Sequence, residues 1–352
     1  MLSIASTEAA VLWQSSSPLV VDEIEFPSSL DVGQVLVELI SSGICGAQIN
    51  EIDAIKGPDK FLPHLLGHEG YCKILEIGPG VTNVKKEDLA IMHWRPGKGI
   101  QSVPPNYKWQ GKPLNAGWVT TFNRHAIVSE NRLTKVSPSL VSKITLPLLG
   151  CALTTALGVL ENEARATFRD KLLIFGAGGV GLALVKLAQF LGIADITIVD
   201  IDSQKLELAS RLGASTTVLF TSKEECNSSL RREFADNLPS VAVDTSGKIA
   251  SIELCYELTA KEARVVLVGV PKAGEKVSIY TLPLHFGKTL RGSEGGGSKP
   301  DIDIPLLLEH LEKGNLKFED FPISVYALSD INSAITDLRT GFLGRMVIDF
   351  EK

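Results

Sequence analysis

Residues 171–200 read KLLIFGAGGVGLALVKLAQFLGIADITIVD, and this stretch contains the pattern that decides the fold. The apolar run 171–175 is typical of a buried strand, and 196–199 is typical of a second strand. Between them, apolar residues recur at helical spacing: Val180, Leu184, Leu187, Ala188 and Leu191. A strand, helix and strand in this order predict parallel strands in an α/β sheet.

The glycines of this stretch form a dinucleotide-binding fingerprint, Gly176-Ala177-Gly178-Gly179-Val180-Gly181. The first glycine permits a tight turn, the second lets backbone approach a pyrophosphate, and the third allows close packing of helix on strand. Asp200 ends the next strand, where its carboxylate would accept hydrogen bonds from ribose hydroxyls and repel a 2′-phosphate. The pattern therefore predicts NAD rather than NADP. Lys205 is interpreted either as a second ribose contact or as a solvated helix residue.

The rest of the chain divides around this unit. Further apolar β runs extend the parallel sheet at 217–220, 241–243 and 265–270. We expect a doubly wound Rossmann domain over residues 154–294. The first part is β-rich, with alternating runs at 34–40 and 71–77 bounded by turn residues. The last part ends in a strand-like run, 346–350, and is expected to return to the first domain. Residues 1–153 and 295–352 would then form one β-rich domain, with Gly295-Gly296-Gly297 as hinge or crossover.

Composition excludes several classes of protein. A chain of 352 residues favours two domains, and 44% apolar with 22% charged residues is ordinary for a globular protein. A net charge of −6 gives no footprint for nucleic acid or an anionic membrane. The longest uncharged stretch, 144–160, is too short to span a bilayer and is interpreted as a buried helix or inter-domain segment. Five widely spread cysteines predict a reducing cytoplasm.

Two cysteines and a histidine are candidate zinc ligands. Zinc takes sulfur and nitrogen ligands, and Cys45, His68 and Cys151 would supply three, leaving one position for water or substrate. Glu69 would be a group behind His68 or a displaceable fourth ligand. The other cysteines are predicted to be small buried hydrophobes: Cys72, Cys226 and Cys255. A metal that polarises an oxygen, beside a cofactor that moves a hydride, predicts an oxidoreductase.

Four motifs resemble the zinc-dependent medium-chain alcohol dehydrogenases: SGICG at 42–46, LGHEG at 66–70, GPGV at 78–81 and LGC at 149–151. They occur in that family's order. The resemblance implies a GroES-like catalytic domain in which Cys45, His68 and Cys151 hold the zinc with Glu69 close behind. It implies that Val268-Gly269-Val270 lines the nicotinamide and that Arg345 reaches the pyrophosphate, although an exposed structural arginine is an equal alternative. A homodimer or homotetramer is also implied.

Two departures from that family affect the chemistry. No cysteine lies between Cys72 and Cys151, so we expect no structural zinc and a lobe that holds its shape by packing. Ala47 stands where many members carry a proton-relaying hydroxyl, and Gln48 where an aspartate often supports the zinc histidine. Proton transfer would need another route, such as water with one of three residues: Asn50, His93 or Glu51.

The predicted activity is reversible hydride transfer between NAD and an alcohol. The region of Trp94, Arg95, Lys112 and Trp118 offers aromatic faces and donors, which favours a polyol, sugar or aminosugar derivative. A surface lobe without ligand contacts is the alternative interpretation of this region. One competing hypothesis is a zinc-independent enone or quinone reductase of the same superfamily. The other is a non-catalytic scaffold that binds the cofactor.

Overall fold

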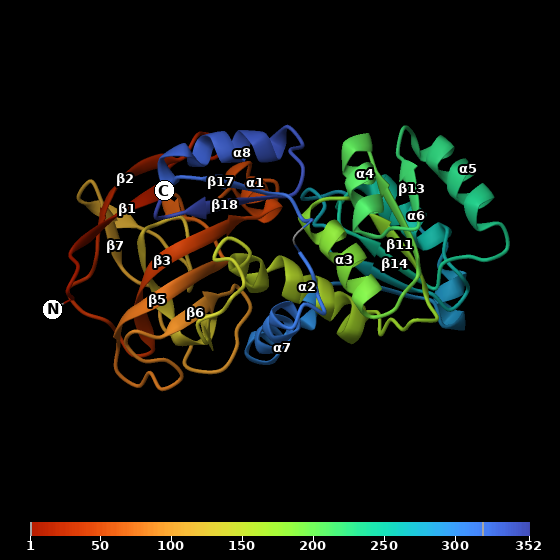
Figure 1. The fold of residues 1–352 in the computed structure, drawn as a ribbon. Coiled ribbons are helices and arrows are strands. Elements are labelled where there is room, and N and C mark those ends of the chain that lie inside the picture. The colour runs from red at the N-terminus through yellow and green to blue at the C-terminus, as the bar shows by residue number, and fades with distance from the viewer. Residues whose placement is uncertain (1, 319) are drawn as a thin grey trace. The chain divides into compact units, whose positions relative to one another are not determined.

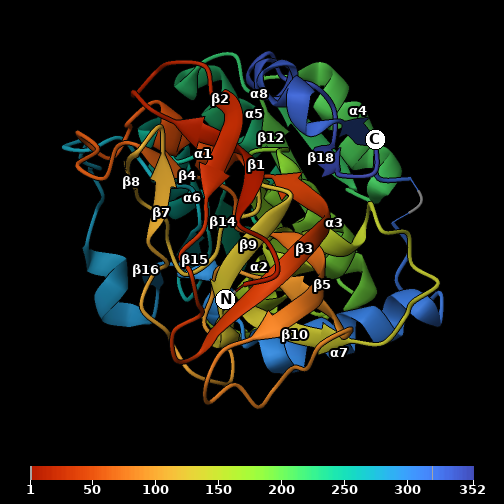
Figure 2. The same ribbon diagram turned by 90° about the vertical axis from the view of Figure 1, so that its left-hand side faces the viewer.

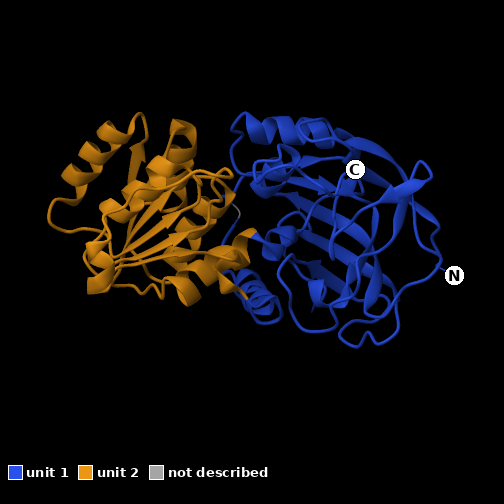
Figure 3. Cartoon of the chain, turned by 180° about the vertical axis from the view of Figure 1, so that it is seen from behind, with its two compact units in different colours: residues 1–151, 299–352 blue, residues 152–298 orange. Residues whose placement is uncertain are grey.

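The chain forms two compact units in a computed structural model that describes residues 2–318 and 320–352 (Figure 1). Unit 1 comprises residues 1–151 and 299–352, and unit 2 comprises residues 152–298 (Figure 3). Unit 2 is therefore an insertion in the sequence of unit 1, and both ends of the chain belong to unit 1. No helix in the described part of the chain is long and apolar enough to cross a membrane.

Unit 2 is built on one parallel sheet with the strand order β13-β12-β11-β14-β15-β16. The strands are β11 (Lys171–Phe175), β12 (Asp195–Asp200), β13 (Thr216–Leu219), β14 (Val241–Asp244), β15 (Arg264–Leu267) and β16 (Thr289–Gly292). The order reverses between β11 and β14, which is the topological switch point of a Rossmann sheet. The α/β fold class predicted from sequence is confirmed, although β15 ends earlier than its apolar run, before Val268.

Helices and turns precede, connect and follow these strands. They are α2 (Ala152–Gly158), the π-helix η3 (Val159–Glu163), α3 (Gly179–Phe190), α4 (Ser203–Leu212), α5 (Lys223–Phe234), α6 (Ile249–Glu257) and the 3-10 turns η4 (Leu282–Phe286) and η5 (Gly295–Gly297). Helix α3 buries nearly all of its apolar residues, and it packs against α2 and α4. Helix α4 begins at Asp202, whose carboxylate accepts from the backbone N–H of Gln204, and ends at Gly213 in the left-handed region.

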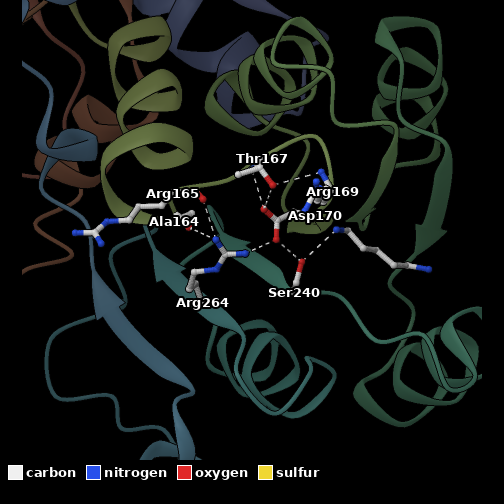
Figure 4. Close-up of polar contacts among 8 residues, drawn as sticks. Ala164, Arg165, Thr167, Arg169, Asp170, Ser240 and Arg264 are labelled. Carbon is white, nitrogen blue, oxygen red and sulfur yellow. Dashed lines mark hydrogen bonds and ion pairs between the residues drawn. The ribbon is translucent and has the colours of Figure 1, made fainter.

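A polar network ties together the amino ends of three neighbouring strands (Figure 4). Asp170, just before β11, accepts a hydrogen bond from the Ser240 hydroxyl at 2.6 Å and pairs with the Arg264 guanidinium. Arg264 also donates to the backbone oxygens of Ala164 and Arg165 at 2.8 and 2.9 Å. The network anchors the amino end of the sheet, whereas the glycine-rich turn lies at the carboxyl end.

Unit 1 contains two sheets whose pairings are antiparallel except that of β17 with β18. The first has the order β4-β1-β2-β7-β8: β1 (Ser6–Leu12), β2 (Val20–Glu25), β4 (His64–Leu65), β7 (Tyr107–Trp109) and β8 (Lys112–Leu114). The second has the order β10-β6-β5-β3-β18-β17, with β9 also on β3: β3 (Gln34–Ile44), β5 (Gly70–Ile77), β6 (Leu89–Met92), β9 (His125–Ser129), β10 (Leu133–Val136), β17 (Ile323–Tyr326) and β18 (Arg345–Asp349).

Strand β3 is an inner strand of the second sheet and lies beside β5 (Figure 2). β9 pairs with its first half and β18 with its second half, so β3 joins segments from both parts of the unit. Short helices complete the unit: α1 (Gly46–Ile52), α7 (Pro300–Glu312), α8 (Ile331–Arg339) and the 3-10 turns η1 (Glu130–Arg132), η2 (Leu146–Gly150) and η6 (Leu328–Asp330). The predicted strand 34–40 thus continues to Ile44, directly before the first candidate ligand.

The lobe that lacks cysteines is held by a buried carboxylate. Glu130 is fully buried, and its carboxylate accepts from the backbone N–H groups of Thr82, Asn83 and Ile100 at 2.7, 2.8 and 2.8 Å. Burial alone would raise the pKa of Glu130, but these donors outweigh it and hold the pKa below its usual value. Gly99 leaves room for this contact, because a Cβ there would lie 2.8 Å from Glu130.

The neighbouring Arg132 fastens a second part of the same lobe. Its guanidinium donates to the backbone oxygen of Trp94 at 2.7 Å and lies 5.3 Å from the centre of the Trp118 ring. The sequence predicted that packing, in place of a structural zinc, holds the shape of this lobe. The structure adds side chains of the 3-10 turn η1 as hydrogen-bonding partners of the surrounding loops.

Candidate functional site

Three side chains of unit 1 form the only candidate metal-binding cluster found among the described residues. The ligand atoms of Cys45, His68 and Cys151 all lie within 4.8 Å of one another. Cys45 follows β3, His68 lies between β4 and β5, and Cys151 ends unit 1 after η2. Three segments distant in the sequence therefore meet at one point, which is what a metal site built on a sheet requires.

The cluster has the chemistry of a zinc site. Both cysteines are buried, and His68 Nε2 is a buried atom with no hydrogen-bond partner among the described residues. A buried polar nitrogen without a partner is costly, and a cation between two thiolates would satisfy it. The Cys151 thiol beside it lowers the pKa of Cys45 well below its ordinary value, against the effect of burial, which raises it. The residues fit zinc.

Glu69 lies outside this cluster and forms a buried ion pair. Its Oε1 pairs with Arg345 Nη2, while its Oε2 has no hydrogen-bond partner in the described part of the chain. Gly43 makes the pair possible, because a Cβ at that position would lie 2.5 Å from Oε1. The equal alternative for Arg345, an exposed structural residue, is wrong, because its side chain is buried. The zinc contact of Glu69 and the pyrophosphate contact of Arg345 remain predictions.

The other cysteines are confirmed as buried residues outside the cluster. Burial raises the pKa of all three thiols: Cys72, Cys226 and Cys255. His93, considered above as a proton carrier, is also buried, and burial lowers its pKa to about 4. Its two ring nitrogens lie 2.7 Å from the Arg95 backbone oxygen and 2.9 Å from Thr134 Oγ1. Each ring nitrogen of His93 therefore has a partner within the protein.

Three glycines of the glycine-rich turn in unit 2 have different surroundings. Gly176 has a φ of 97°, in the left-handed region that favours glycine. A Cβ on Gly181 would lie 1.8 Å from the Gly176 backbone oxygen, so only glycine lets α3 approach β11. A Cβ on Gly178 would meet nothing within 4 Å. The space in front of Gly178 is open, and Gly179 and Val180 form the first turn of α3 behind it.

Asp200 ends β12 and faces the glycine-rich turn. One carboxylate oxygen accepts from the Ala177 backbone N–H at 2.6 Å and the other from the Asp202 N–H at 3.0 Å. Asp200 thus orients the turn as well as being available to a ribose. Lys205 lies half-buried in the first turn of α4. The ribose contacts of both residues remain predictions.

Two further loops at the carboxyl ends of β14 and β15 complete this edge. Val268 is half-buried and Val270 is exposed, and Gly269 between them approaches Gly247 so closely that a Cβ would lie 2.1 Å from its nitrogen. Thr245 Oγ1 lies 2.9 and 3.0 Å from the backbone oxygens at 175 and 176. Sequence reasoning did not single out Thr245, although the polar run DTSG after a buried strand was the available signal.

Comparisons with known proteins agree with this fold and site. The alcohol dehydrogenase GroES-like domain matches residues 31–138, and the zinc-binding dehydrogenase domain matches residues 179–313. The chain therefore belongs to the zinc-dependent medium-chain dehydrogenase/reductase family, whose members typically use NAD(H). Cys45, His68 and Cys151 are its candidate zinc site.

Individual relatives cover nearly the whole chain. S-(hydroxymethyl)glutathione dehydrogenase from Aspergillus oryzae is 27% identical, over 97% of this chain and 95% of that protein. Alcohol dehydrogenase 1 from Trifolium repens is 26% identical, over 99% of this chain and 98% of that protein. Among solved structures, benzyl alcohol dehydrogenase from Acinetobacter calcoaceticus superposes with a TM-score of 0.87 at 25% identity. The superposition covers 98% of this chain and 99% of that chain.

Proposed function

We propose that this protein is an NAD-dependent alcohol dehydrogenase that transfers a hydride reversibly between an alcohol and the nicotinamide. The observation that carries the proposal is the cluster of Cys45, His68 and Cys151, in which both cysteines are buried and His68 Nε2 has no partner among the described residues. The family is one of alcohol dehydrogenase-type oxidoreductases, and the fingerprint of unit 2 supports NAD. This combination counts against the zinc-independent reductase, which would have no use for the cluster.

In this proposal the chain's own residues divide the work. Cys45, His68 and Cys151 would hold zinc, which when bound supplies a Lewis acid that lowers the cost of removing a hydroxyl proton. The buried pair of Glu69 and Arg345 keeps a carboxylate behind the site without adding net charge. The open face at Gly178 would receive the pyrophosphate, and Asp200 would accept hydrogen bonds from the ribose.

The proton must leave without a hydroxyl at position 47. Ala47 is exposed and carries no titratable group, and both nitrogens of His93 have structural partners. We infer that the proton passes to water, with Asn50 and Glu51 of α1 as the remaining polar candidates from the sequence. Glu51 is exposed and Asn50 is half-buried.

We also propose that the alcohol substrate is polar and carries several hydroxyl groups, as a polyol, sugar or aminosugar derivative does. Its support is the cluster of donors and aromatic rings around Trp94 and Trp118, although Arg95 lies 5.7 Å from the centre of the first ring and Arg132 lies 5.3 Å from that of the second. The Arg132 guanidinium already donates to the Trp94 backbone oxygen and to Gln101 Oε1, so the support for this proposal is the aromatic rings more than that arginine. The homodimer or homotetramer and the cytoplasmic location predicted from sequence also remain predictions.

The experiment measures zinc content and NADH formation together on the purified, zinc-loaded chain. The substrate panel contains polyols, aminosugars, benzyl alcohol and S-(hydroxymethyl)glutathione. We expect one zinc per chain and NADH formation with at least one alcohol. Cys45→Ala should lose the zinc and the turnover but keep NAD binding, whereas Cys72→Ala, a buried cysteine outside the cluster, should keep all three.

Three results would contradict the proposal. Full turnover by the zinc-free Cys45→Ala variant would rule out a zinc-dependent reaction, and a wild type that binds no zinc would favour the enone or quinone reductase. One bound zinc and a normal NAD binding curve, without turnover on any alcohol of the panel, would favour the non-catalytic scaffold.

A further inference from the structure

Gln48 connects two of the three candidate ligands. Its Oε1 accepts from the backbone N–H of Cys45 at 3.0 Å, and its Nε2 forms a short contact with His68 Nδ1. Its own backbone N–H donates to the Cys45 backbone oxygen at 3.0 Å, so Cys45 and Gln48 are bonded to each other in both directions at the start of α1. Gln48 is 1% exposed, and no solvent competes for these contacts.

The Cys45 N–H fixes the orientation of the Gln48 amide. A backbone N–H can only donate, so the amide atom facing it must be the oxygen, and the NH₂ group must face His68. The NH₂ group can only donate, so His68 Nδ1 must offer its lone pair. A neutral imidazole carries one proton, which then lies on Nε2. Nε2 is the atom that has no partner among the described residues.

Zinc requires the opposite arrangement of the ring. A histidine binds zinc through a lone pair, so Nε2 must lose its proton and Nδ1 must carry one. Nδ1–H would then face the NH₂ group of Gln48, and two donors would oppose each other. A rotation of the amide by about half a turn would give Nδ1–H an oxygen, but it would leave the Cys45 N–H facing a donor.

We propose that Gln48 is a positioning residue whose amide turns over when zinc binds, with His68 exchanging a proton on Nε2 for one on Nδ1. The ring's charge is unchanged, because solvent takes one proton and returns another. Gln48 therefore favours the metal-free tautomer and weakens zinc binding. This inference rests on the zinc site of the proposed function but on neither its substrate nor its cofactor.

A carboxylate at position 48 removes the conflict. It would accept from the Cys45 N–H with one oxygen and from His68 Nδ1–H with the other, with and without zinc. We expect Gln48→Glu to bind zinc about tenfold more tightly than the wild type in competition with a chelator, as is typical for a group that orients a metal ligand. Gln14→Glu, the same change at an exposed position of unit 1, should leave the affinity unchanged.

The tautomer itself is observable by NMR on the full chain with ¹⁵N-labelled histidine. The sequence has six histidines, and a His68→Asn spectrum identifies the signals of His68. In reduced, metal-free wild type we expect the proton on Nε2, and with one equivalent of zinc we expect it on Nδ1. In metal-free Gln48→Glu we expect it on Nδ1 already.

The outcomes separate this inference from the proposed function. A proton on Nδ1 in the metal-free wild type would overturn the inference, even if Gln48→Glu bound zinc more tightly through its charge. Unchanged affinity in a folded Gln48→Glu variant, or His68 signals that zinc does not move, would also overturn it. A zinc-dependent change of tautomer without alcohol oxidation would overturn only the proposed function.

Discussion

Replacement of Glu130 by glutamine tests whether a hydrogen-bonded carboxylate holds the lobe that lacks cysteines. In the structure, one oxygen of Glu130 accepts from the N–H groups of Thr82 and Asn83, and the other accepts from Ile100. In Glu130→Gln the amide oxygen can keep the first two donors. Its NH₂ group then faces the Ile100 N–H, so one hydrogen bond is lost and two donors oppose each other.

The loss is estimated from these three contacts. A hydrogen bond to a charged group contributes about 1.5–3 kcal/mol, and the two remaining bonds become weaker because they are no longer charge-assisted. We expect a loss of about 3 kcal/mol in the free energy of unfolding. For a unit of this size, that corresponds to a decrease of about 10 °C in its melting temperature.

Calorimetry of the zinc-loaded protein without NAD measures the effect, and the transition of unit 1 is identified by its dependence on zinc. Glu207→Gln, the same change at an exposed position of α4, serves as the control. The pKa of Glu130 is depressed in the folded protein, so its contribution is present above the unfolded pKa and is lost as pH falls through the folded value. A melting temperature no lower than that of the control would refute the role assigned to Glu130.

Two more outcomes follow from the site. Gly181→Ala should lower the stability of unit 2 measured by calorimetry, because its Cβ would lie 1.8 Å from the Gly176 oxygen. Gly178→Ala should leave the stability unchanged and weaken NAD binding measured by titration. Equal losses of stability in the two variants would contradict this assignment. The pKa of His93 is lowered from 6.5 to about 4, so the free energy of unfolding should fall by about 3 kcal/mol as the pH drops between these values. Urea titrations at several pH values should show that the free energy of unfolding depends less on pH in His93→Asn than in the wild type. An equal pH dependence in the two proteins would show that another group titrates.

The Rossmann unit was largely predictable because its information is local. The apolar strands, the helical spacing of α3 and the glycine spacing each depend on neighbouring residues, and β11 and α3 appear where the pattern indicates. The end of β15 was overestimated, since apolar residues continue past Leu267 into the loop that passes Gly247.

The candidate site was predictable only in part. The three candidate ligands were visible within motifs, but their meeting depends on strand pairing within unit 1 that no local pattern encodes. Glu130 looks like any charged residue in the sequence, and only the folded chain shows that its carboxylate is buried among three backbone donors. Gln48 was noticed as a departure from a family pattern, but only the folded chain shows that its amide contacts both Cys45 and His68.

The insertion of unit 2 within unit 1 has a consequence for the order of events on the ribosome. Strand β18 pairs with the second half of β3, and its first residue, Arg345, is the partner of Glu69. Translation delivers that arginine only after unit 2 has emerged, and domains generally fold as units during synthesis. The nascent chain therefore contains Cys45, His68 and Cys151 before it contains Arg345, the ion-pair partner of Glu69. Zinc that bound during synthesis would bind before β18 had joined the sheet.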